Sequence, residues 1–265
     1  MRPSVFAKSW RDRSRGFIGW SIAIVALVAL VMAFYPSIRD NSEFTEALEQ
    51  IPEGLKFLIG ENPLDSPAGY LDSQLFAYFV PAILMVYGIG QAADSIAGEE
   101  QRHTMDLLLA NPVTRSRVIL EKFSATLTGL AILHGLLAAT LVLGARMVDM
   151  DIPVSNLLAA SLACFVLVAA VSALALTVGA ASGKKGSAIA ISSAVAVAGF
   201  LINSLASQID ALEVPSRISP FYYYGGSRAL IDGLQPRVAV LVVATTLLVI
   251  AAVVSFDRRD VNLER

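Results

Sequence analysis

Six apolar runs separated by polar segments dominate the chain. An α-helix needs about 20 apolar residues to cross the hydrocarbon layer of a bilayer, and each run reaches or approaches that length. The predicted spans cover residues 17–35, 75–93, 123–145, 154–181, 188–205 and 238–255. The pattern therefore predicts an all-α polytopic membrane protein in which residues 1–265 form a single transmembrane domain.

The composition supports this fold class. The chain is 55% hydrophobic and only 16% charged, whereas a soluble domain of similar size carries nearer a quarter of charged residues. Cys164 is the only cysteine of the chain, so an intrachain disulfide is excluded, and it lies inside a predicted span. The two histidines, His103 and His134, lie on different segments, so we expect no metal site.

The distribution of Lys and Arg predicts the orientation of the chain. Six spans place both termini on one side, and 14 of the 20 Lys and Arg residues fall in the segments on that side. Because positive charge accumulates in cytoplasmic loops, we expect both termini in the cytoplasm. Residues 1–15 would form an interfacial helix or a charged flank there. Outside, residues 36–70 would form a solvated cap or a lid, and residues 208–236 a second large segment.

The segment between the second and third spans, residues 98–115, is unlike its neighbours. Its start is charged, and three apolar residues then share one helical face at the i, i+3, i+4 spacing: Met105, Leu108 and Leu109. Thr104 can cap this short helix and Pro112 ends it, while Thr114 can cap the helix that follows. A stiff amphipathic rod of this kind either enters a groove on another protein or lies on lipid headgroups, and its physics alone favours neither.

The order of residues in this segment carries a family resemblance. It reads Gly98-Glu99-Glu100-x-x-x-Thr104-Met105-Asp106-Leu107-Leu108-Leu109-x-x-Pro112-Val113-Thr114-Arg115. Together with the six spans, this pattern resembles the type-2 (ABC-2) permeases of ATP-binding cassette exporters over nearly the whole chain. One departure is His103, where family members usually carry glycine, which adopts left-handed backbone angles more readily.

The resemblance implies a role for this segment and a set of partners. It would dock a cytoplasmic ABC ATP-binding subunit, which would hold the ATP and Mg²⁺, while this chain would bind no cofactor. A second permease subunit, identical or different, would complete the pathway in the cell membrane of a prokaryote. The docking residues would be Gly98, Glu99, Glu100, Arg102, Thr104, Met105, Leu107, Leu108, Leu109, Pro112 and Arg115.

The resemblance also implies the kind of transport. The family exports drugs, peptide antibiotics, lipids, polysaccharides and ions, and a small hydrophobic or amphipathic compound is the expected cargo, as in multidrug or antibiotic efflux. It further implies a short helix in residues 208–236 before the last span. The alternative is a non-transporting membrane scaffold or assembly factor, including a permease-like subunit for metalloenzyme maturation. We expect no nucleic-acid partner in either case.

Few residues inside the chain suggest chemistry of its own. The run Gly179-x-x-x-Gly183-Lys184-Lys185 is one residue short of a phosphate-binding loop and lacks its Ser or Thr, so we expect no ATPase activity and no enzyme. The predicted spans contain no acidic residue and no catalytic constellation.

His134 is an ionisable residue near mid-membrane, and such residues are functional candidates by default. It could line the translocation pathway, as could Thr126 and Asn203, or it could be a neutral histidine bonded within the bundle.

Overall fold

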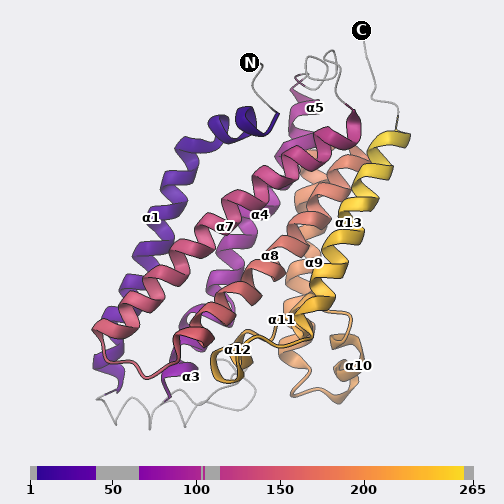
Figure 1. Ribbon diagram of the computed structural model, residues 1–265. Coiled ribbons are helices and arrows are strands. Elements are labelled where there is room, and N and C mark those ends of the chain that lie inside the picture. The colour runs from indigo at the N-terminus through magenta and orange to yellow at the C-terminus, as the bar shows by residue number, and fades with distance from the viewer. Residues whose placement is uncertain (1–4, 40–65, 103, 105–113, 260–265) are drawn as a thin grey trace.

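The computed structural model describes residues 5–39, 66–102, 104 and 114–259. Within these residues every regular element is helical, and six helical stretches are long and apolar enough to cross a membrane (Figure 1). The all-α prediction is therefore confirmed, and each of the six predicted spans lies within one of these stretches. Five of these stretches lie in single helices: α1 (Val5–Arg39), α7 (Arg115–Met147), α8 (Val154–Ser182), α9 (Lys185–Leu205) and α13 (Val238–Arg258).

The remaining stretch, the second span, is a composite helix. It runs through α3 (Pro67–Leu71), η2 (Asp72–Phe76), α4 (Phe79–Ala93), η3 (Asp94–Gly98) and α5 (Glu99–Gln101). Both η2 and η3 are π-helical turns, which insert a residue into the helix and recur at functional sites. This span begins earlier than the predicted residue 75, because the side chain of Ser66 caps it and Pro67 occupies its first turn.

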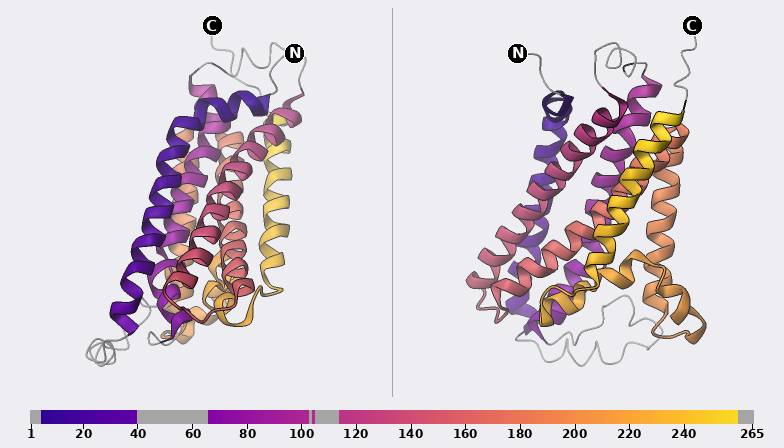
Figure 2. Two further views of the ribbon diagram at one scale, coloured as in Figure 1. Left: turned by 60° about the vertical axis from the view of Figure 1, so that its left-hand side comes forward. Right: turned by 45° about the vertical axis from the view of Figure 1, so that its right-hand side comes forward.

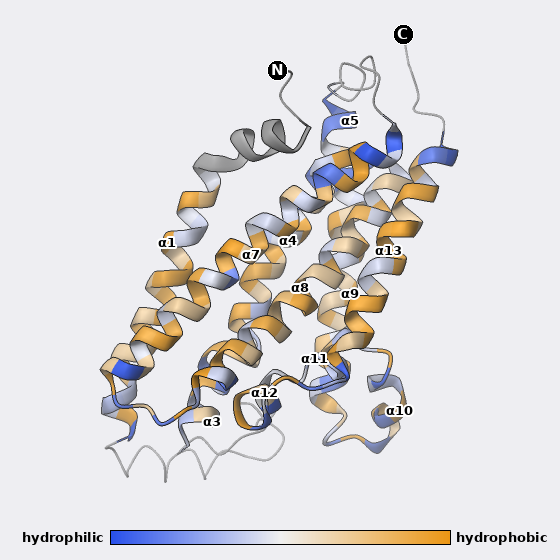
Figure 3. Cartoon of the chain, viewed as in Figure 1, coloured by the Kyte–Doolittle hydropathy of each residue, from blue (hydrophilic) through white to orange (hydrophobic). Residues whose placement is uncertain are grey.

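The third span also begins before its predicted start at residue 123. The side chain of Thr114 accepts a hydrogen bond from the amide of Arg117, so the predicted cap is confirmed and the helix starts at Arg115. The first two turns of α7 mix charged and apolar residues at the hydrophilic end of the bundle (Figure 3), and the charged ones lower their mean hydropathy. Hydropathy alone therefore placed the start two turns too late.

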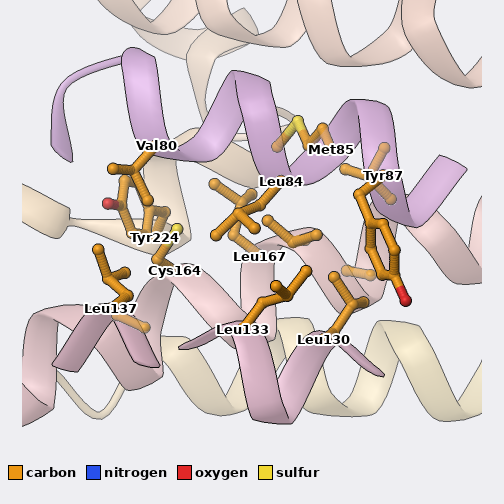
Figure 4. Packing of buried hydrophobic residues seen from close by; sticks show 14 of the residues in the cluster. Val80, Leu84, Met85, Tyr87, Leu130, Leu133, Leu137, Cys164, Leu167 and Tyr224 are labelled. Carbon is orange, nitrogen blue, oxygen red and sulfur yellow. The ribbon is translucent and has the colours of Figure 1, made fainter. Parts of the chain in front are cut away.

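The centre of the bundle is α8, the most buried of the six spans. It packs against α4, α7, α9 and α13, and its many alanines allow these helices to approach closely. Figure 4 shows the apolar core, in which side chains from α4, α7 and α8 meet: Val80, Leu84, Met85, Tyr87, Leu130, Leu133, Leu137, Cys164 and Leu167. In contrast, α1, α9 and α13 keep most of their apolar surface on the outside of the bundle.

The two ends of the bundle differ in character. One end, at the top of Figure 1, holds the start of α1, α5, the start of α7, the α8–α9 turn and the end of α13, and Figure 2 shows the same grouping from two other sides. Hydrophilic residues gather there (Figure 3), and we call it the charged end. The start of α1 and the end of α13 thus lie on one side of the bundle, as an even number of spans requires.

The opposite end is closed by short helices: η4 (Asp210–Leu212), α10 (Glu213–Ser216), α11 (Pro220–Tyr224) and α12 (Gly226–Asp232). Side chains anchor them to the spans. Ser219 Oγ donates to the carbonyl of Gly199 at 2.7 Å, and Asn156 Nδ2 donates to the carbonyl of Ile231 at 2.7 Å. The short helices before the last span agree with the family resemblance.

Candidate functional site at the charged end

Asp94 forms the first of three ion-paired centres at the charged end. Its Oδ1 lies 2.7 Å from Lys185 Nζ on α9, and both carboxylate oxygens accept from the guanidinium of Arg102 at 3.0 Å. These hydrogen bonds from Arg102 to Asp94 raise the pKa of Arg102. Gly98 makes room for the arrangement, because a Cβ at that position would clash with Asp94 Oδ1. The centre joins the end of the second span to α9.

Glu99 forms the second centre and joins α5 to α7. Its Oε1 lies 2.5 Å from Lys122 Nζ, and the Lys122 side chain is 0% exposed while that of Glu99 is 18% exposed. An ammonium group so fully removed from water is tolerated only when it is paired. The backbone carbonyl of Glu99 also accepts from the amide and hydroxyl of Thr104, at 3.0 and 3.1 Å. Thr104 therefore closes the turn after α5.

Glu100 forms the third centre with Arg259, the residue that follows α13. The α8–α9 turn lies against this pair at Gly183, which adopts a left-handed φ of 66°. A side chain there would be strained and would meet the Arg259 guanidinium. Arg115, on the other side of the polar segment, donates to the carbonyls of Phe256 and Arg259 at 3.0 and 2.7 Å.

The structure thus brings six of the predicted docking residues to the charged end, and each has a contact or a packing role within the chain: Gly98, Glu99, Glu100, Arg102, Thr104 and Arg115. The remaining five lie outside the described residues: Met105, Leu107, Leu108, Leu109 and Pro112. The sequence suggested that Arg102 and Arg115 would contact a partner, whereas here both bind groups of their own chain. The described charged residues therefore hold the base of the segment against the spans.

The predicted pathway residues do not form one site. Thr126 and His134 are both buried on α7 but are about 12 Å apart along its axis, and Asn203 lies half-buried on α9. His134 Nδ1 is 2.8 Å from the carbonyl of Leu130 in its own helix, and its ring meets the Phe165 ring edge-on. These contacts favour the interpretation of His134 as a residue of the bundle interior.

The family described as ABC-2 family transporter protein matches residues 4–261, nearly the whole chain. The chain belongs to this family. It is accordingly a multi-pass membrane protein of the kind that serves as a permease component of ABC transporters and associates with an ABC ATP-binding subunit. No curated protein matches the chain significantly.

Sequence reasoning missed one buried acidic residue of this ABC-2 protein. Asp72 is 1% exposed and lies in η2, so the expectation that no span contains an acid is wrong. The error arose because the second span was started at residue 75. The signal was present in the Ser66-Pro67 pair, a typical cap and first-turn proline, which moves the start of the span ahead of Asp72.

Asp72 has an aromatic neighbour in the closing helices of the opposite end. Tyr224 of α11 is fully buried, and burial, with further contributions from Cys164 and Asp72, raises the pKa of its phenol well above the usual value. The phenol donates to the carbonyl of Phe76 at 3.1 Å. This hydrogen bond ties α11 to the π-helical turn that carries Asp72.

Proposed function

We propose that this chain is the membrane-spanning permease subunit of an ATP-driven exporter. It moves a small hydrophobic or amphipathic compound out of the cell, and a separate cytoplasmic subunit binds ATP and Mg²⁺ and supplies the energy. Family membership supports the permease role. The observation that supports energy coupling lies at the base of residues 98–115. There the adjacent carboxylates of Glu99 and Glu100 pair with basic residues of two different helices.

The mechanical argument starts from the ridge of the segment. Met105, Leu108 and Leu109 form an apolar face that a groove on the ATP-binding subunit would bury. A force applied there moves spans only if the base of the segment is firmly attached to them. Glu99 attaches the base to α7 and Glu100 attaches it to the end of α13, while Asp94 ties the preceding turn to α9. Closure of the ATP-binding subunits would therefore act on three spans together.

Two permease subunits would enclose the translocation pathway. Among the glycines of the second and third spans, Gly88 and Gly129 are covered within the chain by Ser172 and Tyr87, whereas a Cβ at Gly90 or Gly135 would meet nothing within 4 Å. Close helix contacts in membranes form at small residues of this kind. The two open glycines are therefore candidates for contact with a second permease subunit, identical or different.

The proposal is tested by purifying the chain with the ATP-binding protein encoded beside its gene. We expect a stable complex whose ATPase activity is stimulated by a hydrophobic or amphipathic cargo, and whose mass corresponds to two permease and two ATP-binding subunits. A complex that forms but shows no cargo-stimulated ATPase activity in lipid would favour a scaffold instead. Failure to form any complex would contradict the proposal.

The orientation is tested separately by labelling. In a Cys164→Ser background, Lys184→Cys places an exposed thiol in the α8–α9 turn at the charged end. Ile218→Cys places one at the opposite end, where Ile218 is 87% exposed. Because we assign the charged end to the cytoplasm, a membrane-impermeant thiol reagent applied to intact cells should label the Ile218→Cys protein only. Labelling of the Lys184→Cys protein alone would reverse the assignment.

A further inference from the structure

An arginine at the closed end of the bundle has no acceptor for its hydrogen bonds. Arg237 directly precedes α13, at the point where the apolar stretch of the last span begins. Within the residues that the structure describes, its guanidinium forms no hydrogen bond and no ion pair, although its Nε is buried. Arg217, at the same end, pairs instead with Glu213 at 3.2 Å. Because buried donors without an acceptor are rare in folded proteins, Arg237 points to an acceptor outside the chain.

Packing holds the Arg237 guanidinium in place. It lies 5.8 Å from the centre of the Tyr222 ring in α11, and it also lies against Gly225, between α11 and α12. Gly225 has a left-handed φ of 52°, and a side chain there would be strained and would clash with the guanidinium. The side chain is thus fixed by a ring and a glycine rather than by hydrogen bonds. The donors of its terminal nitrogens therefore remain available to a ligand.

The surroundings of Arg237 place it at the surface of the hydrocarbon layer. Leu234 and Val240, three residues before and after it, are 47% and 45% exposed. The α13 helix that follows is apolar along its length and lies at the edge of the bundle (Figure 3). A long cationic side chain next to exposed apolar residues typically keeps its charge at the level of the lipid headgroups. Phospholipid phosphates lie at that level.

The features of this position favour a phosphate group over a carboxylate of the chain. Asp232, the acid nearest to Arg237 in sequence, is exposed and forms no ion pair with it in the described part of the chain. The first three amides of α13, residues 238–240, donate to carbonyls three residues earlier at 3.1, 3.0 and 3.1 Å, so the helix end itself offers no free donor there. The available donors belong to a planar guanidinium, whose fork matches two oxygens of one phosphate.

We propose that Arg237 binds the phosphate group of a phospholipid at this face of the membrane, with Tyr222 and Gly225 as the residues that position its guanidinium. The acyl chains of the lipid cover the exposed apolar side chains beside Arg237. The bound lipid then contacts the start of the last span at the point where the closing helices α11 and α12 meet it. This inference goes beyond the transport role and does not depend on it.

The test measures lipid binding to the purified full-length chain in mild detergent by native mass spectrometry. Phosphatidylglycerol is compared with a diacylglycerol that has the same acyl chains but no phosphate. We expect the unmodified chain to retain phosphatidylglycerol and to lose the diacylglycerol. Arg237→Met should weaken phosphatidylglycerol binding about tenfold or more, as expected for the loss of charge-assisted hydrogen bonds. Arg237→Lys should have an intermediate effect, because it keeps the charge but loses the fork and the ring contact.

The matched control is Arg217→Met, which removes the same atoms from an exposed arginine at the same end. It should leave phosphatidylglycerol binding unchanged, because Arg217 already pairs with Glu213. If Arg237→Met does not fold, Arg237→Gln carries the same expectation. An excess of inorganic phosphate separates two sources of the same chemistry. Lipid that stays bound supports a phospholipid site, and lipid that is displaced supports an Arg237 site for free phosphate.

Two results would overturn the proposal. One is equal retention of phosphatidylglycerol and the diacylglycerol by the unmodified chain, which would show that the phosphate is not recognised. The other is an equal effect of Arg237→Met and Arg217→Met on lipid binding, even if Arg237→Met alone lowers thermal stability, since Arg237 would then serve only to join α11 to α13. Either result would leave the proposed permease role intact.

Discussion

Replacing Leu108 and Leu109 with aspartate is expected to abolish retention of the ATP-binding subunit while leaving membrane insertion normal. The two leucines lie on the apolar ridge predicted for residues 98–115. If the ridge enters a groove, the variant buries two unpaired carboxylates at a cost of several kcal/mol, and changes of that size at the centre of an interface eliminate binding. The measurement is co-purification of the two subunits from membranes, with quantification of the ATP-binding subunit per permease chain.

The control for this variant carries the same charge change elsewhere. Val214 and Ile218 are 70% and 87% exposed at the opposite end of the bundle, so Val214→Asp with Ile218→Asp adds two carboxylates without touching the charged end. That variant should retain the ATP-binding subunit fully. If the Leu108 and Leu109 variant co-purifies with a full complement of the subunit and transports normally, these two leucines are not the docking surface.

Replacing Lys122 with methionine is expected to destabilise the protein by about 3–5 kcal/mol, the usual cost of removing one partner of a buried ion pair. The Lys122 side chain is completely buried and lies 2.5 Å from Glu99, so its loss leaves the Glu99 carboxylate unpaired in a largely dry site. Thermal unfolding of the purified chain in mild detergent, followed by the loss of monodisperse protein, measures the effect.

The third span also provides the control for Lys122. Arg117 and Glu121 form an exposed i,i+4 pair 2.6 Å apart, and Arg117→Met should cost no more than about 1 kcal/mol because water screens the pair. The double change Lys122→Met with Glu99→Leu should recover most of the lost stability, since it removes both buried charges. Equal destabilisation by Lys122→Met and Arg117→Met would show that the Glu99–Lys122 pair contributes no more than a surface pair.

The large effect expected from breaking the Glu99–Lys122 pair does not follow from the sequence alone. In the sequence, Glu99 and Glu100 follow each other at the start of a polar segment, and both are predicted as docking residues with nothing to distinguish them. The structure separates them, because Glu99 pairs with a fully buried lysine and Glu100 with Arg259 at the end of the last span. Neighbours in the chain thus have different partners, 23 and 159 positions away.

What the sequence by itself determined follows from properties that are local. A membrane span depends on the length and composition of one apolar run, so all six could be placed without knowledge of their neighbours. The Thr114 cap depends on residues three apart, and it was found for the same reason. The order of residues in the 98–115 segment, taken together with the six spans, carries the family resemblance, which the family match over residues 4–261 confirms.

The tertiary structure decided the features that depend on distant residues. Hydropathy cannot show that Asp72 is buried, because burial there is provided by helices that come much later in the chain, among them α12. Nor can it show that Arg115 holds the terminus of α13, since the carbonyls that it binds belong to Phe256 and Arg259. The partners of a charge are set by which helix ends meet in space, and that arrangement arises only when the whole bundle packs around α8.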